Sequence, residues 1–489
     1  MRFTQQVKAH MSDFILKQLP YDLSNQAGLA LVGKYLKRIN INSLVDPAFS
    51  VRSGIANSDI LKSYLGLLCL GKNDFDAIEG QRKDAFFARA LGLRAVPSSP
   101  TLRQRMDTHA VSWFDLADRI NAAVLGLKIG GKHVDFGVLP CGYMPLDVDT
   151  FAMDNSGTAK EHVGRTYAGV DGYCPWVAYL GTQGFCLELA LRPGTQHSAS
   201  ETEYNIERVL PLAAKLTQSA GSDTGAGGSL GTGATAAMGA SGQGTPLLFR
   251  ADSGFDSAKL MCAIGQQAKA LGREVAFIIK WNPRTTPVET VAKAKVADAN
   301  TVWVTLREGK RQCLWADGVE LKHGHEVLVA RRVYRLTERT IDKRGQQMLL
   351  PEYVLEGWNT TLPDAAFGPE QVIALYADHG THEQFHSEFK TDMDLVRLPS
   401  GKFDTNYLVC ALAAVAMNLL RLVGQHTLHE PDAPVRHTAQ RRRIRTVMQE
   451  LMFKAARLIS HARQWVLGLG ANDTAFAVFE RHWHQLDTA

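Results

Sequence analysis

Residues 141–192 most constrain the fold, because the hydrophobic period changes there from helical to alternating. In the run GYMPLDVDTFAM, apolar residues or Thr occupy every second position, and the acids Asp147 and Asp149 fall on the opposite face. Such alternation is typical of a β-strand. Two further apolar runs follow, PWVAYLG and FCLELALR, separated by Gly181 and Gly184. The segment therefore predicts a three-stranded meander.

A strand, a polar turn, a helix and a second strand are expected later in the chain. The run PLLFRADSGFD is apolar until Asp252 enters a turn, KLMCAIGQQAKAL has helical spacing, and EVAFIIK is apolar again. This order is typical of a βαβ unit, so the sequence predicts an α/β fold. Before this unit, residues of about 218–245 are dominated by Gly, Ala, Ser and Thr and predict a flexible surface loop.

The remaining regions differ from this core in their hydrophobic pattern. Residues 1–135 have helical spacing and include SSPTLRQRMD, which fits either a DNA-reading helix or a plain surface helix. Residues 282–367 alternate in short runs and predict a β-rich insertion. We therefore expect five parts: a helical N-terminal region (1–135), a first part of the α/β core (136–281), a β-rich insertion (282–367), a second part of the core (368–425) and a basic helical C-terminal region (426–489).

The cysteines and the hydropathy pattern argue against several classes of protein. Seven cysteines are scattered without a CxxC pair or a Cys/His cluster at metal-ligand spacing, which favours reduced thiols over a zinc module. The N-terminus has no apolar core of signal-peptide length, and the longest apolar run, Leu408 to Leu420, is too short to span a bilayer. We therefore expect a cytoplasmic protein of two to four structural units that does not contact a membrane.

The stretch YADHGTHEQFHSEFK carries an unusual set of polar side chains. In a regular helix, Tyr376, Glu383 and Lys390 lie seven residues apart and return to nearly the same angle, with His379 and His386 beside them. One face would then present an acid, a base, a phenol and two imidazoles in place of the usual Leu and Val. Both a solvated polar face and a functional face fit this pattern, and partners elsewhere in the chain decide between them.

Three acids stand where an acid is costly: Asp149 inside a strand, Asp252 at the end of a strand, and Glu383 on a helix. In a ribonuclease-H-like sheet, the first strand and the next parallel strand are neighbours, and a later helix packs across their ends. The three carboxylates would then converge and repel each other without a cation. With two Mg²⁺ ions about 4 Å apart, they would form an oxygen cage suited to phosphodiester cleavage. Asp147, on the same strand face as Asp149, is an alternative first ligand.

The C-terminal region concentrates positive charge. Between Arg436 and Arg463 there are eight Lys or Arg and one acid, a local balance of +7 against +5 for the whole chain. Apolar residues from Ile444 to Ile459 recur at helical spacing and predict a packed helix. Its basic face fits either plain solvation or a phosphate backbone. The residues that would contact DNA are Arg441, Arg442, Arg443 and Arg445.

Three blocks resemble the catalytic blocks of the DDE transposases of bacterial insertion sequences. They are PLDVDT, RADSGFD and Tyr376-x2-His379-x3-Glu383-x6-Lys390. The third block resembles the branch that reads Tyr-x2-Arg-x3-Glu-x6-Lys, and HGTHEQ is most similar to the insertion-sequence 1380 family. The resemblance spans residues of about 140–425. It implies a ribonuclease-H-like α/β core that is interrupted by a β-rich insertion and flanked by helical N-terminal and C-terminal regions.

The resemblance also implies roles for single residues. Asp149, Asp252 and Glu383 match the three metal ligands, and Tyr376 and Lys390 match residues that position the DNA strand.

This chain has His379 where the branch has Arg, which predicts a weaker or pH-dependent contact with phosphate. The branch commonly holds a flipped base on an aromatic residue of the β insertion. Trp303, Trp315 and Trp358 are candidates for that role or for strand packing.

A transposase of this kind binds the terminal inverted repeats of its mobile element. It cleaves DNA with two Mg²⁺ ions, for which Mn²⁺ can substitute, and joins the freed 3′-hydroxyl to target DNA. The resemblance therefore implies double-stranded DNA as the partner and a homodimer in the DNA complex, within the bacterial cytoplasm at the nucleoid. Two alternatives stay open: a catalytically decayed or domesticated DNA-binding protein, and a ribonuclease-H-like nuclease without strand transfer.

Overall fold

The computed structural model describes residues 18, 20–218, 244–284, 286–437, 439 and 441–488. The expected Gly/Ser/Ala loop lies almost entirely outside these residues, as does the N-terminal stretch 1–17.

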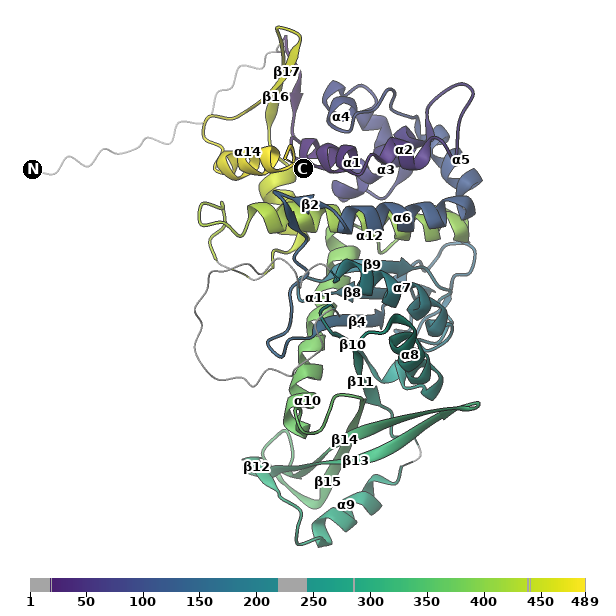
Figure 1. The fold of residues 1–489 in the computed structure, drawn as a ribbon, viewed down its shortest axis with the longest axis vertical. Helices are drawn as coiled ribbons and strands as arrows, with labels where there is room; N and C mark the ends of the chain where they lie inside the picture. The colour runs from purple at the N-terminus through teal and green to yellow at the C-terminus, as the bar shows by residue number, and fades with distance from the viewer. Residues whose placement is uncertain are drawn as a thin grey trace, which may run out of the picture.

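A nine-stranded mixed sheet runs through the molecule in the order β12-β13-β14-β15-β11-β10-β4-β8-β9 (Figure 1). Its strands are β4 (Met144–Thr150), β8 (Trp176–Leu180), β9 (Phe185–Ala190), β10 (Leu247–Ala251), β11 (Val275–Trp281), β12 (Val304–Arg307), β13 (Lys310–His323), β14 (Glu326–Ile341) and β15 (Gln347–Thr360). β4, β8 and β9 form the predicted antiparallel meander. β10 is parallel to both β4 and β11, so the centre of the sheet is parallel.

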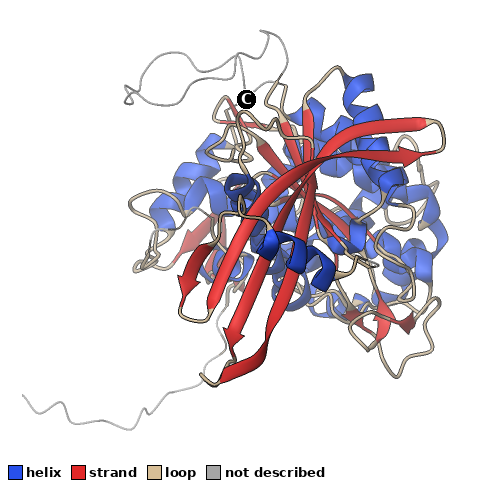
Figure 2. Cartoon of the chain, turned by 90° about the horizontal axis from the view of Figure 1, so that it is seen from below, coloured by secondary structure: helices blue, strands red, loops and turns tan. Residues whose placement is uncertain are grey.

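The strands expected as an insertion continue this same sheet, because β15 pairs antiparallel with β11. Figure 1 shows β13, β14 and β15 at the end of the molecule far from the N-terminal helices, and Figure 2, seen from below, shows these long strands in front of the helices. Trp358 is buried, whereas Trp303 and Trp315 are half-buried and lie beneath the cations of Arg311 and Lys295. A helix, α9 (Val288–Ala297), packs beside β15.

Helices form the N-terminal region. They are α1 (Leu29–Arg38), α2 (Ile41–Val45), α3 (Asn57–Cys69), α4 (Ala85–Ala90), α5 (Ser99–His109) and α6 (Phe114–Leu125), with short 3₁₀ turns η1 (Phe75–Gln81) and η2 (Val111–Trp113). Between β9 and β11 lie α7 (Thr202–Leu216) and α8 (Ala258–Leu271), which pack on each other. Two small sheets, β2-β3 (Lys128–Ile129, Lys132–His133) and β5-β7-β6 (Met153–Asp154, Asp171–Tyr173, Gly164–Arg165), flank β4 in the sequence.

One long apolar helix, α12 (Phe403–Thr427), joins the helical body to the sheet by packing on α6 and β9. It is longer than the predicted run, and by length and composition alone it could cross a membrane. However, 89% of its most apolar window is buried inside the protein. Burial therefore identifies it as a core helix, as predicted.

The predicted C-terminal helix through Ile459 is wrong. α13 (Ile444–Val447) and a π turn, η7 (Met448–Met452), are followed by a hairpin of β16 (Ala456–His461) and β17 (Gln464–Leu469), and then by α14 (Phe476–Gln485). Ala462 and Arg463 both have positive φ, the conformation of a two-residue turn that matches the twist of paired strands. β16 also pairs with β1 (Leu23–Ser24), so a segment before the N-terminal helices lies beside this C-terminal hairpin. Strand pairing with β17, extended by β1, thus outweighs local helical spacing.

The stretch Tyr376–Lys390 is helical but not one regular helix. It runs through α10 (Pro369–Ala377), the 3₁₀ turn η5 (Asp378–Thr381), α11 (His382–Ser387) and the π turn η6 (Glu388–Asp392). A 3₁₀ turn winds more tightly than an α-helix, and a π turn more loosely, so both change the angle of the residues that follow. The expected single polar stripe is therefore absent: Glu383 is exposed, whereas Tyr376 and Lys390 are half-buried.

Candidate active site

The register of two parallel strands places Asp149 beside Asp252. Val148 of β4 pairs with Ala251 of β10. Asp149 directly follows Val148 in the sequence, and Asp252 directly follows Ala251. Neighbouring strands lie about 4.8 Å apart, so paired positions on one face bring their side chains together. The two carboxylates predicted from distant parts of the sequence thus meet at the carboxyl ends of adjacent strands.

Asp252 shows the electrostatic effect of this proximity. Its Oδ1 accepts a hydrogen bond from the Gly254 amide at 2.9 Å, which caps the short 3₁₀ turn η4 (Ser253–Phe255). Burial and the negative charge of Asp149 together raise the pKa of Asp252 above its ordinary value. Two carboxylates that disfavour each other's charge are a common feature of cation sites.

The alternative ligand Asp147 has a different environment. It pairs in register with Arg250 and accepts two hydrogen bonds from that guanidinium, at 2.7 and 2.8 Å. His379 Nδ1 lies 3.1 Å from its Oδ1. Both oxygens are therefore engaged in a buried ion pair, which favours Asp149 as the first ligand. His379, expected to contact phosphate, is itself buried against Asp147.

The helical stretch brings two imidazoles to Asp149. His382 Nε2 lies 2.5 Å and His386 Nε2 3.1 Å from Oδ2 of Asp149. Residues i and i+4 share one face of a helix, so α11 presents both rings to the end of β4. His382 Nδ1 also bonds to the His379 carbonyl oxygen, and His386 Nδ1 lies 3.1 Å from the Tyr179 hydroxyl. Each ring is thus held at both nitrogens.

The charges of this cluster are coupled. Burial works against the charged form of Asp149, but the hydrogen bonds from His382 and His386 prevail and hold the pKa of the carboxyl well below its ordinary value. For His382, burial is likewise outweighed by Asp149, so its pKa is raised. For His386 burial prevails and the pKa is lowered. Asp149 therefore favours the charged form of His382 enough to outweigh burial, but not that of His386.

Glu383, the predicted third carboxylate, lies on the exposed side of α11. In the described part of the chain it makes no hydrogen bond or ion pair with Asp149 or Asp252. Its neighbour His382 touches Asp149, so Glu383 lies next to the cluster along the chain, with its own side chain exposed to solvent.

Two tyrosines and a lysine lie around the carboxylates. Burial and the charges of Asp252 and Asp149 raise the pKa of Tyr376, and burial raises that of Tyr167 to about 12. Tyr167 also donates to the Thr150 carbonyl oxygen at 3.2 Å. Lys390 Nζ lies 5.8 Å from the centre of the Phe151 ring, next to the cluster. These groups can donate hydrogen bonds or positive charge to a bound anion.

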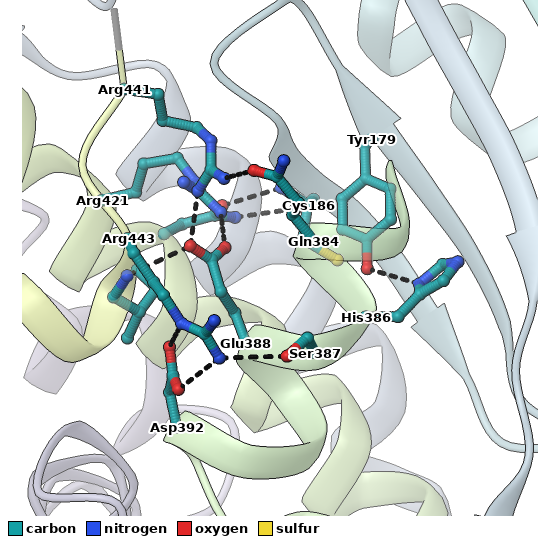
Figure 3. Close-up of polar contacts among 12 residues, drawn as sticks. Tyr179, Cys186, Gln384, His386, Ser387, Glu388, Asp392, Arg421, Arg441 and Arg443 are labelled. Carbon is teal, nitrogen blue, oxygen red and sulfur yellow. Dashed lines mark hydrogen bonds and ion pairs between the residues drawn. The ribbon is translucent and has the colours of Figure 1, made fainter. Parts of the chain in front are cut away.

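The basic residues near Arg441 do not form one solvated face. Figure 3 shows Arg421 and Arg441 converging on the buried carboxylate of Glu388. Arg443 makes two hydrogen bonds to Asp392, at 2.8 and 2.9 Å.

Arg442 donates to the carbonyl oxygens of Leu428 and His437, so three of the four predicted DNA contacts are bonded within the protein. Arg445 differs from them. Its side chain is exposed and forms no ion pair within the described residues.

The role of His382 was missed at the sequence level, and that of His386 was noted only as a polar neighbour. A signal was present, because two His four residues apart with Glu after the first, HEQFH, is the helical spacing of many zinc ligands. Tyr167 and Tyr179 carry no comparable signal, since only the fold brings them near Asp149.

Comparison with known proteins leaves the family open. No protein-family model matches the chain, and no curated protein matches it. The chain is similar to the piggyBac transposase in a cryo-EM structure of its synaptic complex with hairpin DNA, at 10% identity and a TM-score of 0.39, over 88% of this chain and 80% of that one. A likeness at this level does not decide fold or function, so the site is interpreted from its own residues.

Proposed function

We propose that this chain is a DDE transposase with Asp149, Asp252 and Glu383 as its metal ligands. The observation that carries the proposal is the pairing of β4 with β10, which sets Asp149 and Asp252 side by side at one edge of the sheet. The raised pKa of Asp252 supports it, because a second carboxylate held close to the first is stabilised by a bound cation.

The strand order supports a ribonuclease-H-like core. Five strands run β9-β8-β4-β10-β11, with an antiparallel meander followed by two parallel strands. The helical stretch α10–α11 then returns to the edge where Asp149 and Asp252 lie. This is the arrangement in which a third acid from a later helix reaches the carboxylates of the first two strands.

The donor set fits Mg²⁺ at two of the three positions. Asp149 and Asp252 offer carboxylate oxygens, the ligands that Mg²⁺ prefers, whereas Glu383 faces solvent. The proposal therefore requires Glu383 to turn toward Asp149 when DNA is bound. Two bound ions would supply activation of the attacking oxygen and stabilisation of the leaving oxygen.

Residues around the carboxylates would hold the DNA strand. Tyr167 and Tyr376 keep their protons at neutral pH and can donate to phosphate oxygens. Lys390 and the exposed Arg445 supply positive charge. His379 is buried and bonded to Asp147, so in this proposal it positions the strand end and does not contact phosphate.

The proposal includes the partners that the sequence resemblance implies. The chain binds the terminal inverted repeats of its element and target DNA, acts as a homodimer in the DNA complex, and works in the bacterial cytoplasm with Mg²⁺ or Mn²⁺. Cleavage is followed by strand transfer.

The test uses duplexes that carry the inverted repeats flanking the reading frame. Glu383→Gln should reduce Mg²⁺-dependent end cleavage to background while leaving end binding, measured by fluorescence anisotropy, nearly unchanged. Glu370→Gln, at an exposed acid in the first turn of α10, is the matched control and should retain both activities. Loss of binding with cleavage retained in Glu383→Gln would refute the assignment.

Precut ends separate the alternatives. Joining of a precut 3′ end to target DNA supports a transposase, and cleavage without joining identifies a nuclease. Binding without cleavage by the unsubstituted protein, with either Mg²⁺ or Mn²⁺, identifies a decayed or domesticated DNA-binding protein.

A further inference from the structure

Asp149, His382 and His386 form a compact three-donor cluster. Their ligand atoms, one carboxylate oxygen and two imidazole nitrogens, all lie within 4.8 Å of one another. The side chains are 16%, 8% and 7% exposed. Two come from successive turns of α11 and the third from the end of β4, so rigid elements hold all three.

The hydrogen bonds of His382 leave an unusual contact with Asp149. A backbone carbonyl can only accept, so Nδ1 of His382 carries a proton and donates it to the His379 carbonyl oxygen. In the neutral ring, Nε2 then presents a lone pair to Oδ2 of Asp149 at 2.5 Å. Two lone pairs at this distance require a proton shared by the ring and the carboxyl group, or a metal ion that binds both and moves the two atoms apart to the spacing of metal ligands.

This is the arrangement by which proteins orient metal-binding histidines. A ligating imidazole usually donates its other N–H to a carbonyl or carboxylate, which fixes the tautomer and raises the basicity of the ligating nitrogen. His386 has an equivalent support, because the Tyr179 hydroxyl lies 3.1 Å from its Nδ1 and can either donate or accept (Figure 3). Its Nε2 can thus also present a lone pair to an ion.

A further buried nitrogen lies beside the cluster. The ring of His379 lies tilted against that of His382, with centroids 4.0 Å apart, and its Nε2 has no hydrogen-bond partner in the described part of the chain. His379 is only 2% exposed. A buried polar atom without a partner is uncommon in folded proteins and fits a place that a ligand or its bound water completes.

We propose that Asp149, His382 and His386 bind a divalent transition-metal ion of the Zn²⁺ class. Two imidazoles and one carboxylate suit Zn²⁺ or Co²⁺, whereas Mg²⁺ prefers oxygen ligands alone. Three protein ligands leave a fourth position for water or a phosphate oxygen. The site rests on these contacts and does not depend on the proposed function. Because Asp149 is shared, an ion of this class at the site competes with Mg²⁺ for the carboxylate cage.

The test measures metal binding by the full chain in the absence of DNA. The purified protein, reduced and stripped with chelator, is titrated with Co²⁺ while visible absorption is recorded, and Zn²⁺ is then added in competition. One Co²⁺ per chain should give an intense d–d band of low coordination number, without a thiolate charge-transfer band, and Zn²⁺ should displace it.

Substitutions locate the ion. His382→Asn and His386→Asn should each weaken Co²⁺ binding by more than the roughly 10–100-fold effect of losing a group that only supports a ligand. His484→Asn, at an exposed histidine of α14, is the matched control and should leave affinity unchanged. Unchanged affinity in both cluster variants, a thiolate band, or no binding by the unsubstituted protein would overturn the proposal.

Two further measurements test the metal site if a histidine variant fails to fold. Asp149→Asn should also abolish the band, and Zn²⁺ should raise the unfolding temperature of the unsubstituted protein but not of Asp149→Asn. A chain that binds Co²⁺ here yet cleaves no DNA supports the metal site and refutes the transposase. The reverse result refutes the metal site alone.

Discussion

Two carboxylates on opposite sides of one helical stretch have opposite kinds of partner. Asp149 receives two imidazoles from α11, whereas Glu388, two residues beyond His386, receives the guanidinium groups of Arg421 and Arg441. Figure 3 shows His386 turned toward Tyr179 and Glu388 turned the other way. Residues two apart on a helix point in nearly opposite directions, so neighbouring residues of one stretch serve both clusters.

The partners decide what each carboxylate can do. Arginine cannot lose its proton under physiological conditions, so nothing can replace the cations around Glu388 without leaving a buried charge unpaired. Burial opposes the charge of Glu388, but Arg421 and Arg441 lower its pKa below the ordinary value. An imidazole, by contrast, can exchange a proton for a metal ion. The arginine-paired carboxylate is therefore structural, and the histidine-paired one is available for binding.

The largest expected effect separates the two carboxylates by stability. Glu388→Gln removes the anion from a site where Glu388 is 0% and Arg421 2% exposed, and should destabilise the fold by about 3–5 kcal/mol. Asp149→Asn should change stability by less than about 1 kcal/mol, because the Asn amide can donate to a neutral imidazole. Urea unfolding followed by circular dichroism measures both. Equal destabilisation by the two substitutions would contradict the distinction between a structural carboxylate at Glu388 and one available for binding at Asp149.

A second group of imidazoles, His426 and His482, forms no ion pair with a carboxylate of the described residues and extends the comparison. His482 accepts from or donates to the Tyr35 hydroxyl at 2.9 Å and stacks with His426. Burial lowers the pKa of His482 to about 3 and that of His426 to about 4, the reverse of the shift at His382. The direction of the pKa shift depends on whether a carboxylate contact outweighs burial, as it does at His382 but not at His386, His426 or His482.

The pH dependence follows from the sign of these shifts. Between a pH of about 6.5 and 3, the unfolded chain binds a proton at His482 that the folded chain does not, so stability is complete above 6.5 and falls as the pH falls. The loss from His482 should be about 2 kcal/mol between pH 6.5 and 5. His482→Gln should flatten this slope, and the exposed His484→Gln should not. An unchanged slope in His482→Gln would contradict the assignment.

The smallest effect concerns DNA affinity and rests on the proposed function. Arg445 is exposed and unpaired among the described residues, so Arg445→Ala should lower the slope of log affinity against log salt by about 1. Arg443→Ala should change that slope less and lower stability more, because Arg443 is bonded to Asp392. Anisotropy titrations over a range of salt concentrations measure the slope. A larger slope change for Arg443 would show that its pairing yields to DNA.

Much of the core could be predicted because it depends on local pattern. Strict alternation around Asp149 predicts β4, and the apolar runs after it predict the meander that β8 and β9 complete. The apolar run from Leu408 to Leu420 predicts a buried helix for the same reason. The helix predicted through Ile459 does not form, because Ile459 pairs with Val466 in the β16–β17 hairpin and β1 pairs with the start of β16.

The candidate site likewise has some features that local sequence predicts and others that depend on tertiary contacts. The sequence alone placed Asp149 at a strand and Asp252 at a strand end, since hydrophobic period and turn chemistry are written in neighbouring residues. Only the tertiary structure decided which groups contact these acids. Arg250 forms an ion pair with Asp147, imidazoles contact Asp149, and Glu383 is exposed to solvent. The physical reason is that the charge partner of a buried carboxylate is set by strand register and helix phase. A one-residue shift in either changes which side chains meet, and no local pattern records it.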